Sequence, residues 1–134
     1  VIRSEFLSPS DLASWYCGLD AYLSTSSGEA INLAAVEALA CGTHLISPVH
    51  GGVATYATSD NTVPIQFELA IRKDLIKFYL GLMANITAAN VASALDQFVE
   101  EFHGRDFPPL TGFTWADSMQ AVTSHLNRYF SLAL

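Results

Sequence analysis

Two glutamates, Glu29 and Glu37, flank the start of a short apolar segment of the sequence. Every residue from Leu33 to Cys41 except Glu37 is apolar, so we expect a buried helix in which a lone carboxylate needs a partner. Glu29 lies in the polar loop 25–29 that leads into this helix. Because the free N–H groups and positive dipole end of a helix N-terminus bind phosphate, a carboxylate on either side could accept hydrogen bonds from sugar hydroxyls. The spacing therefore predicts a receptor for a sugar nucleotide.

Strands and helices alternate in the first half of the chain, and this order positions the two carboxylates. The helix expected at 9–17 begins with Ser8 as its N-cap and Pro9 at its first position. The helix expected at 33–41 ends at Gly42, where a left-handed residue is favoured. Strands separated by short helices predict a parallel sheet, and ligands bind at the carboxyl ends of such strands. The predicted strands are 1–6, 20–24 and 44–47.

The second half of the chain has a less regular pattern. Helical periodicity predicts a helix over 68–80 and a long amphipathic helix over 88–102, which Thr87 caps. A loop is expected at 104–112, where two prolines and two glycines gather. The remaining predicted elements are strands at 63–67 and 81–86 and a last helix at 115–130. The inward stripe of the helix 88–102 is predicted to consist of Val91, Leu95, Phe98, Val99 and Phe102.

The segment around the two glutamates resembles the signature of the retaining GT-B glycosyltransferases whose C-terminal domain carries a Glu-x7-Glu motif. The resemblance begins at Leu19-Asp20, continues through Thr25–Asn32 and Glu37–Ile46, and includes Gly51-Gly52. Further along, Gly81-Leu82-Met83 resembles the start of the next strand of that family, and Phe113-Thr114-Trp115 resembles the opening of its last helix. The likeness thus spans most of the chain.

This resemblance implies a fold, an activity and a set of site residues. The fold would be α/β, a Rossmann-like parallel sheet flanked by helices that forms the C-terminal half-domain of a GT-B enzyme, with residues 1–134 as one partial domain. The parent enzyme would transfer a hexose from a nucleoside diphosphate sugar to the hydroxyl of an unknown acceptor. It would need no metal or other cofactor. Glu29 would be the catalytic sugar contact and Glu37 the ribose contact, and the donor's sugar and phosphates would be held by the N–H groups of Ala30, Ile31, Asn32 and Leu33.

Several positions depart from the family pattern. Ala30 and Asn32 stand where the family has glycines, and Thr55 stands where many relatives have a glutamate. In the family, the Arg and Lys that neutralise the diphosphate come from a turn that would precede Val1, and an N-terminal domain binds the acceptor. We therefore expect the chain to be an excised piece that packs against such a domain and is inactive alone. The alternative is a non-catalytic, degenerate glycosyltransferase fold that acts as a scaffold or partner-binding module. If neither residue has a functional role, Glu29 is an ordinary solvated acid of a loop and Glu37 is an ordinary surface glutamate.

Composition narrows the remaining classes. The 134 residues suit one domain. A net charge of −7 excludes nucleic-acid binding by a basic patch, and attraction to an anionic membrane is equally unexpected. Charged residues make up only 14% of the chain, which indicates that part of the surface faces other protein. No apolar run is long enough for a membrane span, and no secretory signal is visible, so a cytoplasmic location is the default.

The cysteines and one histidine have simple expected roles. Cys17 and Cys41 are too few and too far apart in the sequence for a disulfide scaffold or a zinc site. Each has apolar neighbours, and we expect both to be buried free thiols. His44 stands where the family has a proline, and we expect a structural role for it.

Overall fold

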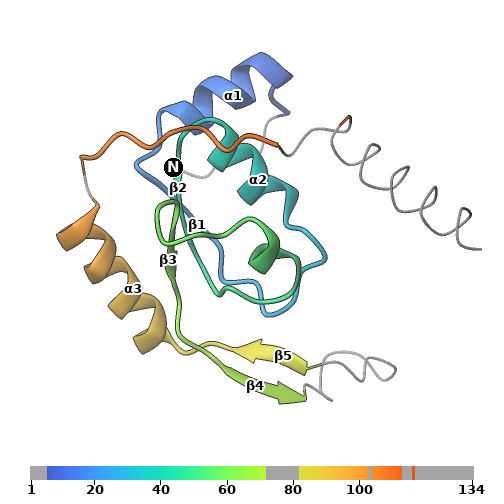
Figure 1. Ribbon diagram of the computed structural model, residues 1–134, viewed down its shortest axis with the longest axis vertical. Helices are drawn as coiled ribbons and strands as arrows, with labels where there is room; N and C mark the ends of the chain where they lie inside the picture. Colours follow the sequence, from blue (N-terminus) through green and yellow to red (C-terminus); the bar gives the residue numbers. More distant parts are fainter. Residues whose placement is uncertain (1–5, 72–81, 103, 113–115, 117–134) are drawn as a thin grey trace, which may run out of the picture.

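A three-stranded parallel sheet forms the centre of the molecule (Figure 1). The computed structural model describes residues 6–71, 82–102, 104–112 and 116. The middle strand, β2, pairs in parallel with β1 on one side and β3 on the other, and every residue of β2 is buried. A strand buried on both faces is typical of a parallel sheet with helices on either side. The strand bounds are Ala21–Leu23 for β1, His44–Ser47 for β2 and Thr62–Pro64 for β3.

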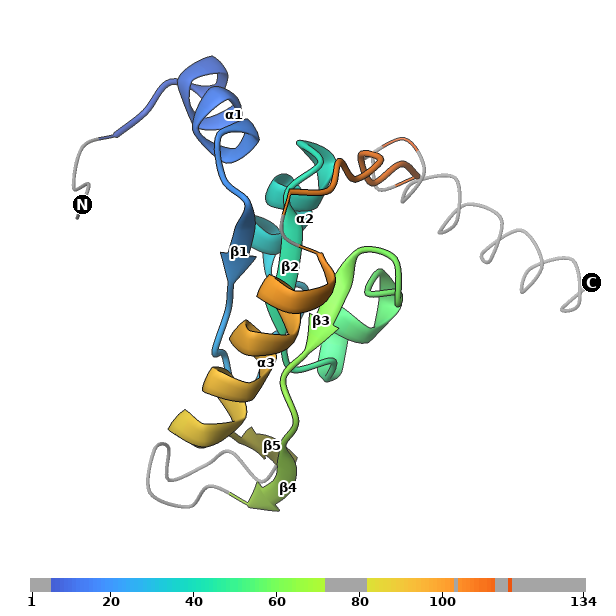
Figure 2. The ribbon, with the colours of Figure 1, turned by 90° about the vertical axis from the view of Figure 1, so that its left-hand side faces the viewer.

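Helices cover both faces of this sheet, as Figures 1 and 2 show from two directions. Side chains of a strand alternate between its faces, so Leu45 packs in the core beneath α2 (Leu33–Ala40). The next residue, Ile46, packs with Phe98 of α3 (Ala88–Glu101) on the opposite face. The predicted α/β class, with a parallel sheet flanked by helices, is therefore confirmed, and the arrangement is compatible with a Rossmann-like fold.

The predicted starts of the helices at 9–17 and 88–102 agree with the structure. The helix α1 (Pro9–Cys17) packs against α2, and the Ser8 hydroxyl accepts a hydrogen bond from the Asp11 N–H at 3.2 Å. The helix α3 begins at a capping box in which Thr87 and Asn90 bond each other's backbone N–H groups. These caps satisfy N–H groups that the first turn of a helix leaves unpaired.

The predicted helix 68–80 is wrong in the part that the structure describes. Residues Glu68–Ile71 form a strand, β4, which pairs antiparallel with β5 (Leu82–Asn85). Leu69 and Ile71 alternate with their neighbours and lie opposite residues of β5, and such cross-strand pairing outweighs a local helical pattern. The hairpin lies beyond the carboxyl ends of the parallel strands (Figure 1). The predicted strand 63–67 is shorter than expected and forms β3.

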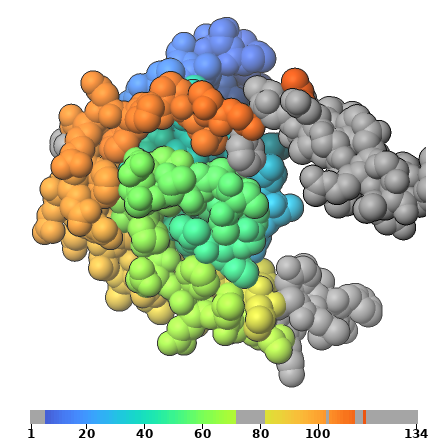
Figure 3. All heavy atoms as spheres, in the orientation of Figure 1, coloured from blue at the N-terminus to red at the C-terminus, as the bar shows by residue number. Residues whose placement is uncertain are grey.

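The segment 104–112 returns across the molecule as the predicted loop, and the Leu110 N–H donates to the Leu39 carbonyl at 2.9 Å. Figure 3 shows this segment (orange) above the green chain that follows β2 and the hairpin below it. The predicted strand 1–6 and helix 115–130, and the remainder of the predicted helix 68–80, lie almost wholly outside the described residues. In the part of the chain that is described, no helix has the length and apolar character to cross a membrane.

Candidate functional site

Three loops meet at the carboxyl edge of the parallel sheet, where the sequence predicts the site. The Glu29 loop (residues 24–32) follows β1, the single turn of 3-10 helix η1 (Gly51–Thr55) follows β2, and the β4–β5 hairpin follows β3. The Gly52 N–H donates to the Glu29 carbonyl at 3.2 Å, and the Ala84 N–H of β5 donates to the Ser27 carbonyl at 2.8 Å. The Glu29 loop is therefore held from both sides by its backbone.

The Glu29 loop enters α2 through a left-handed residue. Asn32 has φ 57° and is the N-cap of α2. Its side-chain oxygen accepts from the Ala35 N–H at 3.3 Å, and its side-chain nitrogen donates to the Ser24 hydroxyl at 2.9 Å. Asparagine tolerates this conformation far better than alanine does. The left-handed backbone thus explains why an asparagine suits this position.

Two close contacts fix the loop backbone against η1. A Cβ on Gly52 would lie 1.7 Å from the Ala30 carbonyl oxygen, so only glycine fits there. The Tyr56 hydroxyl donates to the Ile31 carbonyl at 2.8 Å. This fixes the positions of the backbone groups of Ala30 and Ile31. Pre-positioned backbone groups of this kind bind a ligand without a large ordering cost.

Both glutamates act electrostatically on the same phenol, that of Tyr22 in β1. Burial raises the pKa of Tyr22, and the negative charges of Glu29 and Glu37 raise it further. The Glu37 carboxylate also accepts a hydrogen bond from the Tyr16 hydroxyl at 3.3 Å. Burial and the charge of Glu37 raise the pKa of Tyr16 to about 12, so this phenol donates at any physiological pH. Both carboxylates therefore lie near enough to Tyr22 for their charges to act on its phenol.

The expected burial of Glu37 is wrong. Only one face of α2 packs on the sheet, with Ala35, Ala38 and Leu39 buried, whereas Glu37 is exposed and Leu33 is 63% exposed. Although all residues of α2 except Glu37 are apolar, only the face of the helix toward the sheet is buried. Because Glu37 is exposed, its carboxylate can reach a ligand while the Tyr16 hydroxyl donates to one of its oxygens.

The predicted donor-binding residues lie at an open surface. Glu29, Ala30 and Ile31 are exposed, and the Glu29 carboxylate accepts from the Ser26 hydroxyl at 2.9 Å. The Ala35 N–H is taken by Asn32, and in the described part of the chain no hydrogen bond is recorded for the N–H of Leu33. The first turn of α2 therefore still has a donor for an anion.

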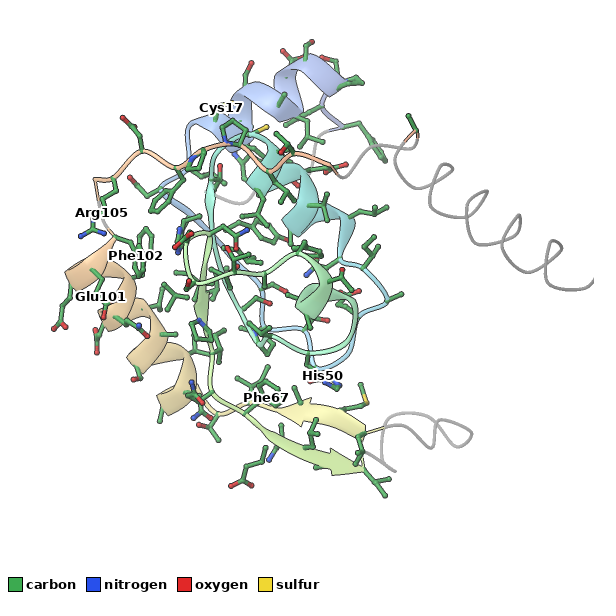
Figure 4. The ribbon with its side chains drawn as sticks, viewed as in Figure 1. Cys17, His50, Phe67, Glu101, Phe102 and Arg105 are labelled. Carbon is green, nitrogen blue, oxygen red and sulfur yellow. The ribbon has the colours of Figure 1, made fainter. Side chains whose placement is uncertain are left out.

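Positive charge is absent from this edge within the described residues. Arg105, the one described lysine or arginine, lies beside Phe102, with 5.7 Å between its guanidinium carbon and the ring centre. Figure 4 shows both at the far end of α3 from His50 and the hairpin. Among the described residues, Glu29 and Glu37 do not line the cavities at the ends of α1 and α2, beside the β4–β5 hairpin or beside β3. In the same described segments, no group of three or more His, Cys, Asp or Glu side chains could hold a metal ion.

The cysteines differ from the expectation of two buried, separate thiols. Cys17 is exposed and Cys41 is partly exposed. The end of α1 packs against the end of α2, and this places both cysteines on the same cavity. Both line a cavity of about 390 Å³ at the end of the sheet opposite the Glu29 loop. Helix packing, rather than sequence spacing, decides their separation.

His44 is fully buried, and neither ring nitrogen has a hydrogen-bond partner among the residues that the structure describes. Its ring lies among Phe98, Phe102 and Phe107, with the ring centres 4.2–5.6 Å away. Burial lowers its pKa to about 4, so His44 is neutral at physiological pH. This placement agrees with a role in packing.

Sequence reasoning did not find the tyrosines of the site. The charges of both glutamates act on Tyr22, the Tyr16 hydroxyl donates to Glu37, and the Tyr56 hydroxyl donates to the Ile31 carbonyl. Burial and the charge of Glu29 raise the pKa of Tyr56 to about 12. The one available signal was the position of Tyr22 in the strand directly before the Glu29 loop. The other two come from separate elements and become visible only in three dimensions.

Comparison with models of known protein families gives no match for this chain, and a search of curated proteins finds no match either.

Proposed function

We propose that this chain is the donor-binding, C-terminal half-domain of a retaining GT-B glycosyltransferase. It would bind a nucleoside diphosphate sugar at the carboxyl edge of the sheet, and the parent enzyme would pass the hexose to an acceptor hydroxyl. The observation that carries the proposal is that the Glu29 loop leads from the carboxyl end of β1 into α2, which carries Glu37, and that the charges of both glutamates act on Tyr22 of β1. A site at this edge is where open α/β sheets bind ligands.

The proposed roles follow from the chemistry of each group. Glu29, in the fixed loop, would accept hydrogen bonds from sugar hydroxyls, and Glu37, one and a half turns or so into α2, would accept from the ribose. The N–H groups of residues 30–33 would face the diphosphate. These groups are neutral dipoles, so the charge of the leaving diphosphate would require the basic residues that the family carries in the turn before Val1. An N-terminal domain would close the cleft, and a cytoplasmic location, where nucleotide sugars are made, fits this role.

A non-catalytic scaffold is the second candidate, and Asn32 favours it. Its side-chain oxygen accepts from the Ala35 N–H, so the N-terminus of α2 is already capped from within the chain. Ile31 and Leu33 are also exposed beside it, which suits contact with another protein surface. In this reading the glutamates remain as a remnant of a lost binding site.

Calorimetric titration with UDP-sugars and GDP-sugars distinguishes the two candidates. We expect weak binding to the chain, with little or no turnover, and a loss of affinity of about tenfold in Glu37→Ala because a charged hydrogen bond of this kind contributes about 1.5–3 kcal/mol. Glu100→Ala is the matched control, since Glu100 is an exposed glutamate of α3, and it should leave affinity unchanged. An unchanged affinity in Glu37→Ala would refute the ribose role, and absence of any nucleotide binding would favour the scaffold.

A further inference from the structure

The ends of α1 and α2 bring two free thiols together. Cys17 is the last residue of α1 and Cys41 is the C-cap of α2. Both cysteines are free and line the same cavity. Because α1 and α2 pack against each other, the two backbones need not move far to join these cysteines, which is the first requirement for a disulfide.

The surroundings of the pair keep it in place. The Thr43 hydroxyl donates to the Tyr16 carbonyl at 2.6 Å, and this hydrogen bond is buried. The Gly18 N–H donates back to the Trp15 carbonyl and ends α1 at this point. Tyr16, next to Cys17, and Thr43, two residues after Cys41, are thus joined across the helix interface. The two helix ends are therefore held together by a bond that does not depend on the sulfur atoms.

The pair is also open to reagents from solution. Cys17 is exposed, and both cysteines line the cavity of about 390 Å³ that reaches the segment 104–109. Figure 4 shows Cys17 at the end of α1, next to this returning segment. A small disulfide in solution therefore meets Cys17 first, while Cys41 lies behind it, less exposed.

From this geometry we propose that Cys17 and Cys41 form a reversible disulfide site, which exchanges with a low-molecular-weight disulfide. The Cys17 thiol loses its proton, and its sulfur attacks one sulfur of the small disulfide. A mixed disulfide forms, and one small thiolate leaves and takes up a proton. Cys41 then loses its proton and attacks the Cys17 sulfur, which releases the second small thiol. The protein loses two protons and two electrons, which together are two hydrogen atoms, and the small disulfide gains them.

The site has a consequence for the candidate donor-binding residues, and this consequence rests on the proposed function. Tyr16 directly precedes Cys17, and its hydroxyl donates to Glu37. A covalent link from Cys17 to the end of α2 would hold Tyr16 against Glu37 and so fix the carboxylate. The formation of the disulfide itself is independent of any sugar nucleotide, so the two ideas fail separately.

The test is equilibration of the reduced chain with mixtures of glutathione and glutathione disulfide, followed by acid quenching, alkylation and mass spectrometry. We expect the monomer to lose two hydrogen atoms, to take up no alkylating reagent and to retain no glutathione. The equilibrium constant for forming the disulfide should be at least about tenfold larger for the folded chain than for the chain in urea. The reason is thermodynamic linkage: a disulfide that stabilises the folded state forms more readily in the folded state, by the same free energy. The oxidised form should melt about 5–10 °C higher than the reduced form.

Single variants provide the control for the two-step exchange. Cys41→Ser should accumulate a persistent glutathione adduct on Cys17, and neither Cys41→Ser nor Cys17→Ser should show the rise in melting temperature on oxidation. Both substitutions are small and conservative, and circular dichroism checks that each variant folds. Independent adducts on both cysteines of the wild-type chain, disulfide-linked dimers, or an equilibrium constant equal to that in urea would overturn the proposal.

Discussion

Replacing Asn32 tests how the structure enters α2, because three effects meet at this residue. Asn32→Ala places an alanine at φ 57°, which costs about 1–2 kcal/mol for a left-handed residue with a Cβ. The substitution also removes the N-cap bond to Ala35, worth about 1 kcal/mol, and the bond to Ser24, worth about 1 kcal/mol. These contributions overlap, and we expect the free energy of unfolding to fall by about 3 kcal/mol.

Asn32→Gly separates the strain from the lost hydrogen bonds. Glycine adopts a left-handed φ without strain and is itself an acceptable N-cap, so we expect a loss of about 1.5 kcal/mol, of which the bond to Ser24 is the main part. Alanine at this position should therefore be less stable than glycine by about 1–2 kcal/mol, although alanine is the better helix former in most positions.

Urea denaturation followed by far-ultraviolet circular dichroism measures both losses. Thr87 provides the matched comparison, because it is also an N-cap but has φ −103°, which any residue adopts. Thr87→Ala and Thr87→Gly should differ by less than about 1 kcal/mol, and the entropy of glycine enters both comparisons equally. If alanine and glycine were equally destabilising at Asn32, or if the difference were as small as at Thr87, the reasoning about backbone strain would be refuted.

Two further outcomes follow from buried contacts elsewhere. Because burial lowers the pKa of His44 to about 4 from an ordinary value of 6.5, the folded state favours the neutral ring; the free energy of unfolding should be constant above pH 6.5 and fall by up to about 3 kcal/mol as the pH drops towards 4. Urea titrations at a series of pH values should show this loss in the wild type and in His50→Gln but not in His44→Leu, and a loss that persists in His44→Leu would contradict the assignment. Gly52→Ala places a Cβ 1.7 Å from the Ala30 oxygen, and it should destabilise the chain by about 3 kcal/mol. The control is Gly28→Ala, whose Cβ would meet only the side chain of Met83, and it should change stability by less than about 0.5 kcal/mol. Equal effects of the two substitutions in urea denaturation would refute the close contact.

The helix starts could be predicted because their signals are local. Ser8 followed by Pro9, and Thr87 followed by Asn90, place a capping side chain directly before the residues whose N–H groups it bonds. Gly42 has φ 78°, as expected for the residue that ends α2 in a left-handed conformation. In each case the partner lies within a few residues, so the sequence contains the whole interaction.

The failed predictions concern interactions between distant segments. Residues 68–71 form a strand because they pair with β5. The helical period of the segment itself contains no information about this partner. Leu95 and Val99 were predicted to face inward, but they are 38% and 63% exposed. The face of α3 that packs on the sheet is narrower than predicted and includes Ala94 and Phe98.

The candidate site shows the same division. The left-handed conformation of Asn32 could be anticipated from the residue type, and the position of the Glu29 loop after a strand could be anticipated from the order of elements. The tyrosines that surround the glutamates and the approach of Cys17 to Cys41 depend on how α1 and η1 pack, and local sequence does not encode these contacts in a recognisable pattern.

A residue-resolved NMR titration of the chain with a UDP-sugar tests the central claim most directly, because weak binding is visible and every backbone N–H reports separately. The account predicts that the largest shift changes fall on residues 29–33 and on Tyr22, and that the residues lining the cavity at the opposite end, among them Gly42 and Phe107, remain unchanged. Shift changes centred on that opposite cavity, or none at all at saturating concentrations of UDP-sugars and GDP-sugars, would contradict it.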